Sequence, residues 1–254
     1  MVRRRRRIKQ KPRPKRSRLW SFLFVLIVAA GLVAYILSLP VWQINNVVVN
    51  GAQMLSADEI RSLAGVPLSE NLFYTSLKRS RNNLEKISAI KKIHFFRIPP
   101  GTVLINIEER QPIATIVFSQ KSVVIDEAGY ILNQNPSISF NVPNLADLPV
   151  ISGLGEGQAL SEGKVSPKVA EIVAEIVVKL ARFLGAERIQ LQLGNLQNIN
   201  FLLDDLLRVK IGDDQQMKKK MQVFEALLPQ VAGKWSNVAY IDVRFPDNPV
   251  IKFK

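Results

Sequence analysis

Residues 19–39 of the chain read LWSFLFVLIVAAGLVAYILSL, a run of 21 residues without a charged side chain. As an α-helix with a rise of about 1.5 Å per residue, this run would extend roughly 30 Å, the thickness of the hydrocarbon core of a bilayer. A helix satisfies its backbone hydrogen bonds internally, so such a segment is stable in lipid. The sequence therefore predicts one transmembrane helix, over residues 19–39.

Aromatic residues flank this predicted span, as they do where membrane helices meet the lipid headgroups. The residues expected to anchor the helix are Leu19, Trp20, Tyr35 and Leu39. A cleaved signal peptide and a buried core helix are the two alternatives. A signal peptide has a shorter apolar region and a small-residue cleavage site, which Ser38-Leu39-Pro40 matches poorly. A core helix would be shorter.

Most of the net positive charge of the chain lies before this span. The net charge is +14, but residues 1–18 hold 11 of the 35 basic residues and no acidic one, so the remaining 236 residues carry only +3. Basic residues beside a span stay in the cytoplasm and attract anionic lipid headgroups. We therefore expect a cytoplasmic tail over residues 1–18, an exported remainder, and no nucleic-acid binding. The residues expected to set this topology are Arg3, Arg4, Arg5, Arg6, Arg7, Arg16 and Arg18.

The exported part is predicted to have an α+β fold in two domains. Residues 43–111 follow the order strand, helix, helix, strand, strand, which predicts two helices on one side of a three-stranded sheet. Ser56 and Glu59 have the spacing of a capping box at the start of the first helix. The five elements are predicted over residues 43–50, 57–63, 75–87, 89–97 and 102–109.

Residues 112–254 are predicted to form a second domain, a mixed and mainly antiparallel sheet with helices. Residues 167–184 repeat apolar side chains at helical spacing, and Asp213 or Asp214 is expected to cap a later helix. Residues 136–164 are rich in Pro, Gly, Ser and Asn and should be largely loop. Residues 238–245 and 250–254 are predicted to form a terminal hairpin whose last strand is a sheet edge, a place where a partner strand can be added.

The sequence offers no constellation of residues for catalysis. The chain has no cysteine, which excludes disulfides and thiolate sites, and its single histidine, His94, excludes any site that needs two imidazoles. Neighbouring carboxylates such as Glu108 and Glu109 point to opposite faces of a strand, so they cannot converge on one substrate. We therefore predict no enzymatic activity, cofactor, metal or small-molecule substrate.

Several short motifs follow the predicted span in a fixed order, and together they resemble the bacterial cell-division family FtsQ/DivIB. The first exported domain is similar to a POTRA domain. The motifs lie at residues 47–51, 55–60, 71–73, 93–97, 99–114, 124–129, 148–153, 209–212 and 239–246.

This resemblance implies a non-enzymatic, single-pass scaffold of the plasma membrane at the division septum. Such a protein links early and late division proteins, binding FtsB/FtsL-like proteins and through them the peptidoglycan synthase complex. Strand addition at the C-terminal sheet edge is the implied mode of binding, although Phe245 could equally pack in the core of its own domain. The implied partner-binding residues are Arg244, Phe245, Val250, Ile251, Lys252 and Phe253.

Two other functions fit parts of the pattern. One is a POTRA-containing component of a membrane-protein assembly or secretion system, although the strands of an accompanying β-barrel are missing. The other is an anchored wall hydrolase or protease, which the missing catalytic residues oppose.

Overall fold

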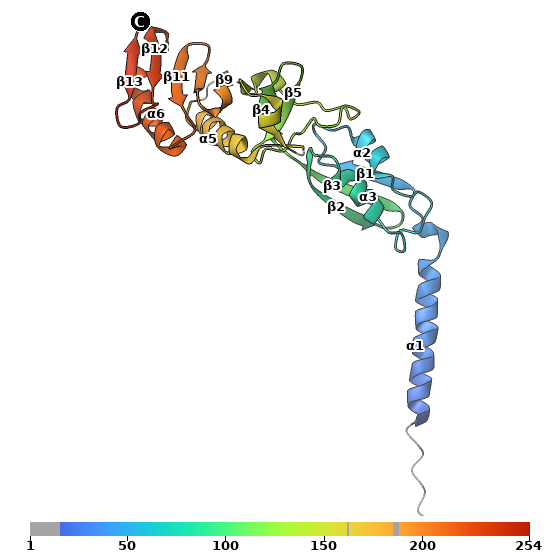
Figure 1. Ribbon diagram of the computed structural model, residues 1–254. Coiled ribbons are helices and arrows are strands. Elements are labelled where there is room, and N and C mark those ends of the chain that lie inside the picture. The colour runs from blue at the N-terminus through green and yellow to red at the C-terminus, as the bar shows by residue number, and fades with distance from the viewer. Residues whose placement is uncertain (1–15, 162, 185–187) are drawn as a thin grey trace, which may run out of the picture. The chain divides into compact units, whose positions relative to one another are not determined.

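The computed structural model describes residues 16–161, 163–184 and 188–254 (Figure 1). The predicted topology residues Arg3, Arg4, Arg5, Arg6 and Arg7 lie outside these ranges. The apolar run forms α1, Arg16–Leu37, which begins three residues before the predicted span and ends two residues before its end. Within α1, Trp20–Leu37 is long and apolar enough to cross a membrane.

The predicted strand–helix–helix–strand–strand order follows α1. The three strands form one sheet in the order β1-β3-β2. In β3 the side chains of Val103, Ile105 and Ile107 are buried and their neighbours are not, as expected for a sheet covered on one face. The elements are η1 (Pro40–Trp42), β1 (Asn46–Asn50), α2 (Ala57–Ala64), α3 (Lys78–Glu85), β2 (Ile90–Ile98) and β3 (Thr102–Glu109).

The predicted capping box of α2 is wrong. Ser56 is the N-cap residue, but its side chain makes no capping hydrogen bond. The Glu59 carboxylate instead accepts a hydrogen bond from the backbone N–H of Ser139, at 3.3 Å. The chain before α2 is held by the buried Glu109 carboxylate, which accepts hydrogen bonds from the N–H groups of Met54 and Leu55 at 2.8 and 3.0 Å. A contact distant in sequence has replaced the local one.

The rest of the chain builds an eight-stranded mixed sheet in the order β13-β12-β11-β10-β9-β6-β4-β5. The pairs β4–β6, β6–β9 and β11–β12 are parallel, and the other four are antiparallel. The elements are β4 (Pro112–Val117), β5 (Ser122–Asp126), η2 (Leu145–Asp147), β6 (Val150–Ser152), α4 (Glu156–Ala159), β7 (Leu160–Ser161), β8 (Lys164–Val165), α5 (Pro167–Leu184), β9 (Ile189–Gln192), η3 (Gly194–Leu196), β10 (Ile199–Leu203), β11 (Leu207–Gly212), α6 (Met217–Val231), η4 (Trp235–Asn237), β12 (Val238–Asp242) and β13 (Val250–Phe253).

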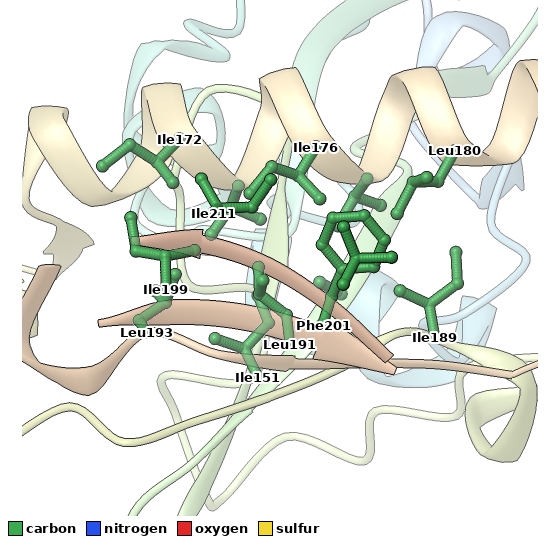
Figure 2. Close-up of a cluster of buried hydrophobic side chains, with 14 of the residues drawn as sticks. Ile151, Ile172, Ile176, Leu180, Ile189, Leu191, Leu193, Ile199, Phe201 and Ile211 are labelled. Carbon is green, nitrogen blue, oxygen red and sulfur yellow. The ribbon is translucent and has the colours of Figure 1, made fainter. Parts of the chain in front are cut away.

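Helices α5 and α6 cover one face of this sheet. Figure 2 shows Ile172, Ile176 and Leu180 of α5 directed toward side chains of the strands. On α6, Phe224 packs edge-to-face against Phe201 of β10, with ring centroids 5.2 Å apart. Each such fully buried side chain contributes about 1.5–3 kcal/mol through the area it removes from water. On the opposite face, β9, β10 and β11 carry polar side chains, among them Gln190, Asn200 and Arg208.

Neither Asp213 nor Asp214 caps α6, contrary to the sequence prediction. The N-cap residue is Gln216, and its side chain makes no capping hydrogen bond. Asp213 instead accepts a hydrogen bond from the buried Lys220 ammonium at 2.5 Å, and Asp214 pairs with Lys168. Asp213 and Asp214 therefore form ion pairs with lysines and do not cap the helix.

The chain divides into two compact units. The first contains the chain up to Asn46 together with Pro67–Thr75 and Arg97–Val103, so it includes α1. The second contains Val47–Val66, Ser76–Phe96 and Leu104–Lys254, so it includes the eight-stranded sheet.

The candidate partner-binding edge

The two outermost strands of the eight-stranded sheet differ in how they are covered. Beyond β5, Leu132 donates a backbone hydrogen bond to the carbonyl of Val124 at 2.8 Å, and Asp126 donates one to Tyr130 at 3.1 Å. Residues 130–133 therefore cover that edge, although they form isolated bridges and no continuous strand. At the other end, β13 pairs with β12, and no other strand of the described residues pairs with it. The last strand is a sheet edge, as the sequence predicted.

The backbone of β13 presents alternate residues to the free side. Lys254 donates its N–H to the carbonyl of Asn237 at 2.9 Å, so its backbone faces β12. Alternate residues of a strand direct their N–H and C=O groups to opposite sides. The backbone groups of Ile251 and Phe253 therefore point away from β12, where another strand could accept and donate hydrogen bonds.

Exposed apolar side chains lie on β13 and in the connection that leads to it. Phe245 is 70% exposed, Val250 51% and Phe253 53%. Ile251 packs partly against the core, and Lys252 is exposed. The alternative that Phe245 packs in the core of its own domain is therefore wrong.

Phe245 and Arg244 lie in the connection between the last two strands. Strand β12 ends at Asp242, three residues before the predicted end, and the N–H of Asn248 donates to the carbonyl of Phe245 at 2.9 Å. The Arg244 guanidinium donates hydrogen bonds to both carboxylate oxygens of Asp242, at 2.7–3.0 Å. Burial of the Asp242 carboxyl would raise its pKa, but the hydrogen bonds from Arg244, together with the positive charges of Arg244 and Lys210, lower that pKa. Arg244 is thereby oriented by an ion pair.

Gly212 makes room for the side chain of Arg244. Its backbone has φ = +78°, and a Cβ at this position would lie 3.0 Å from Cγ of Arg244. Glycine is favoured here on both counts, because other residues rarely adopt this φ and a Cβ would crowd the side chain of Arg244.

The polar face of the sheet next to β13 is mainly basic, which sequence reasoning missed. Lys210 lies 3.8 Å from the centroid of the Tyr240 ring, and Lys252 lies 5.7 Å from it. Arg208, Lys210 and Arg244 line one depression on this face. Of these, Arg244 is hydrogen-bonded to the carboxylate of Asp242, and the charge of Lys210 also acts on it. The basic residues occupy alternate positions along the strands, a pattern that is visible in the sequence. It predicts a basic face only if β11 and β12 are known to be neighbours, and their parallel pairing is not visible in the sequence.

The predicted anchor residues lie at or next to α1. Trp20 and Tyr35 are exposed on the helix, and Leu39 follows its end. Arg16, Arg18 and Leu19 belong to its first turn.

Comparisons with known proteins place the chain in a family. The family model described as "POTRA domain, FtsQ-type" matches residues 43–110, and the one described as "Cell division protein FtsQ/DivIB, C-terminal" matches residues 115–244, about half of the chain. The chain belongs to the FtsQ/DivIB family. This FtsQ/DivIB chain is 25% identical over 238 residues to the cell division protein DivIB of Clostridium tetani, covering 91% of this chain and 87% of the relative.

Two further relatives of this FtsQ/DivIB chain come from other bacteria. It is 24% identical to the cell division protein FtsQ of Corynebacterium glutamicum, covering 84% of this chain and 89% of the relative. It is also 24% identical to DivIB of Staphylococcus aureus strain MRSA252, covering 80% of this chain but only 44% of that relative.

Family membership establishes a role in cell division. Together with α1, it supports a single-pass membrane protein of the division septum that acts through protein partners of the division machinery. The division family favours this role over the secretion component considered above. In the described residues no group of three or more His, Asp or Glu side chains is arranged to hold a metal ion.

Proposed function

We propose that this FtsQ/DivIB chain is a non-enzymatic scaffold that links early and late division proteins at the septum. Its N-terminus lies in the cytoplasm, where residues 1–18 contact anionic lipid headgroups. Residues 43–111 and 112–254 form two exported domains. They bind FtsB/FtsL-like proteins and, through these, the peptidoglycan synthase complex.

The observation that carries this proposal is the uncovered edge of β13. A partner strand gains affinity from backbone hydrogen bonds and specificity from the side chains it meets. Ile251 and Phe253 offer the backbone groups, and the exposed rings of Phe245 and Phe253 offer apolar contacts. Lys252 supplies positive charge on β13 itself, whereas the Arg244 side chain lies across β12, next to Gly212 of β11. Strand addition of an FtsB-like segment uses the groups of β13, and a partner that also covers the end of β12 meets Phe245 and Arg244.

A proline substitution separates strand addition from simple side-chain contact. Phe253→Pro removes both the ring and an outward N–H, whereas Phe253→Ala removes only the ring. Neither change affects a backbone donor that faces β12. Proline is tolerated on an edge strand when its missing N–H points to solvent.

The full-length protein, reconstituted in nanodiscs, would be titrated with a fluorescent peptide from the exported end of an FtsB-like partner. We expect the proline variant to bind at least tenfold more weakly than the alanine variant. Equal affinities of the two variants would refute strand addition at β13. The proposed orientation of the chain in the membrane has its own test. Protease added to intact spheroplasts should degrade the two exported domains. If the domains survived, the proposed orientation would be wrong.

A further inference from the structure

The C-terminal end of α1 is held by side chains from the segments that follow it. The last carbonyl groups of a helix have no partners within the helix. Here the Trp42 indole N–H donates a hydrogen bond to the carbonyl of Ile36, and the Asn71 amide donates one to that of Leu37, both at 2.7 Å. All four residues belong to the first compact unit. The end of the helix is therefore attached to residues 67–75 by direct contacts.

Apolar side chains are exposed beside this attachment. Val41 is 56% exposed, Leu68 60% and Tyr74 61%, and Phe73 is also exposed. We call these four residues the membrane-proximal patch. Val41 and Leu68 line one depression of about 500 Å³, and the Phe73 ring packs edge-on against Trp42 at 5.3 Å. Val41, Leu68 and Phe73 thus lie around the residues that follow α1, and Tyr74 is the next residue after Phe73 in the chain.

Charged side chains are nearly missing from these segments. The sequence from Leu19 to Ala57 contains no charged residue, and residues 67–75 contain only Glu70. One oxygen of that carboxylate accepts a hydrogen bond from the Thr75 hydroxyl at 3.0 Å. One basic side chain contacts these segments, since the Arg97 guanidinium donates a hydrogen bond to the carbonyl of Thr75 at 2.7 Å. The surface beside the end of α1 therefore carries little charge.

The length of α1 places the patch at the membrane surface. The 18 residues Trp20–Leu37 extend about 27 Å, close to the roughly 30 Å of a hydrocarbon core, so Leu37 lies at its boundary. Asn71 contacts Leu37 directly, and the headgroup layer adds about 5–7 Å on each side. Tyr and Trp rings favour that layer because one end is apolar and the other polar.

We propose that the membrane-proximal patch is a second membrane contact, in which Val41, Leu68, Phe73 and Tyr74 insert into the headgroup region of the leaflet where α1 ends. The occupant is lipid, and the contact fixes the first exported segments against the bilayer. This inference requires α1 to span the membrane, but it does not depend on strand addition at β13.

The test uses the absence of cysteine from the chain, which allows single labels. Leu68→Cys and Tyr74→Cys would carry a polarity-sensitive fluorophore in the full-length protein, in liposomes that contain a lipid with a nitroxide at the headgroup. Leu206→Cys is the matched control, since Leu206 is a similarly exposed leucine, at 49%, in the second compact unit. Val28→Cys, with a nitroxide deep in the acyl chain, reports whether α1 spans the bilayer.

We expect headgroup nitroxide to quench the labels at positions 68 and 74 at least twofold more than the label at position 206. Quenching no greater than at position 206 would overturn the proposal. Protection from aqueous iodide without nitroxide quenching would also overturn it, because a protein such as a second copy would then cover the patch. An unquenched label at position 28 would show that α1 does not span the bilayer, and the inference requires that it does.

Discussion

Replacing Phe245 by alanine should weaken binding of an FtsB-like peptide without weakening the fold. The ring is 70% exposed, so the core loses little when it is removed. A phenylalanine side chain can bury roughly 200 Å², of which about 140 Å² is free at this position for a partner. If the partner covers half of that area, the lost contact is worth about 1.7 kcal/mol at about 25 cal/mol per Å². That energy corresponds to roughly a 15- to 20-fold rise in Kd.

The assay is the same peptide titration of the full-length protein, joined to a urea unfolding curve of each variant. Leu206→Ala is the matched control, because it removes an exposed apolar side chain from the turn between β10 and β11, away from β13. We expect Phe245→Ala to raise the Kd at least tenfold and to leave the unfolding midpoint within the range of the control. An unchanged Kd would refute the role assigned to Phe245, and an equal loss of affinity in the control would show that the effect is not specific to the edge.

Two further predictions concern stability. Asp213→Asn leaves the buried Lys220 ammonium without its carboxylate, and we expect a loss of about 1–3 kcal/mol in urea unfolding at pH 7. The hydrogen bond from Lys220 lowers the pKa of Asp213, so the stability difference between wild type and variant should persist down to about pH 4. It should shrink as the pH falls further, because the wild-type carboxylate then becomes protonated. A stability difference that does not depend on pH would contradict the ion pair. Gly212→Ala should cost about 1–2 kcal/mol, because alanine is strained at φ = +78° and crowds Arg244. An unaltered unfolding midpoint for that variant would show that the backbone at the end of β11 adjusts without cost.

The elements that could be predicted from the sequence are those with a clear local period. The apolar spacing over residues 167–184 predicts α5 with the bounds that the structure has. The alternation along residues 102–109 predicts β3 in the same way. In both cases the apolar residues recur several times within one element. Only a helix, for α5, or a strand, for β3, places all of these side chains on one face where they can be buried together.

Short strands paired in parallel could not be predicted. Strand β6 has only three residues, Val150–Ser152, within a stretch predicted to be loop, yet it lies between β4 and β9 in the sheet. Three residues are too few to show a period of two. Their conformation is determined by hydrogen bonds to strands that are distant in sequence, and no local pattern reports these.

Polar side chains with two possible partners were assigned to the wrong one. Ser56 with Glu59, and Asp213 with the start of α6, both have the spacing of helix caps. In the structure Glu59 is bound to Ser139, and Asp213 to Lys220. A cap competes with every other donor that the fold brings near, and a buried ammonium requires a carboxylate more strongly than a helix end requires a cap. The hydrogen bonds of Trp42 and Asn71 to α1 could not be predicted either, because no sequence pattern near these residues indicates which carbonyl groups they bind.

The sequence predicted which strand forms the candidate edge, but not that the other edge of the sheet is covered. The last strand of a chain is often a sheet edge, and this tendency predicted the position of β13, whereas the covering of the β5 edge by residues 130–133 is visible only in the fold. An exposed edge strand tends to pair with other copies of itself. Here β13 is short, Pro249 precedes it, Lys252 lies on it and Lys254 follows it, so that two such strands would bring like charges together. The same lysines attract a strand of opposite charge, so the features that oppose self-association also favour an acidic partner.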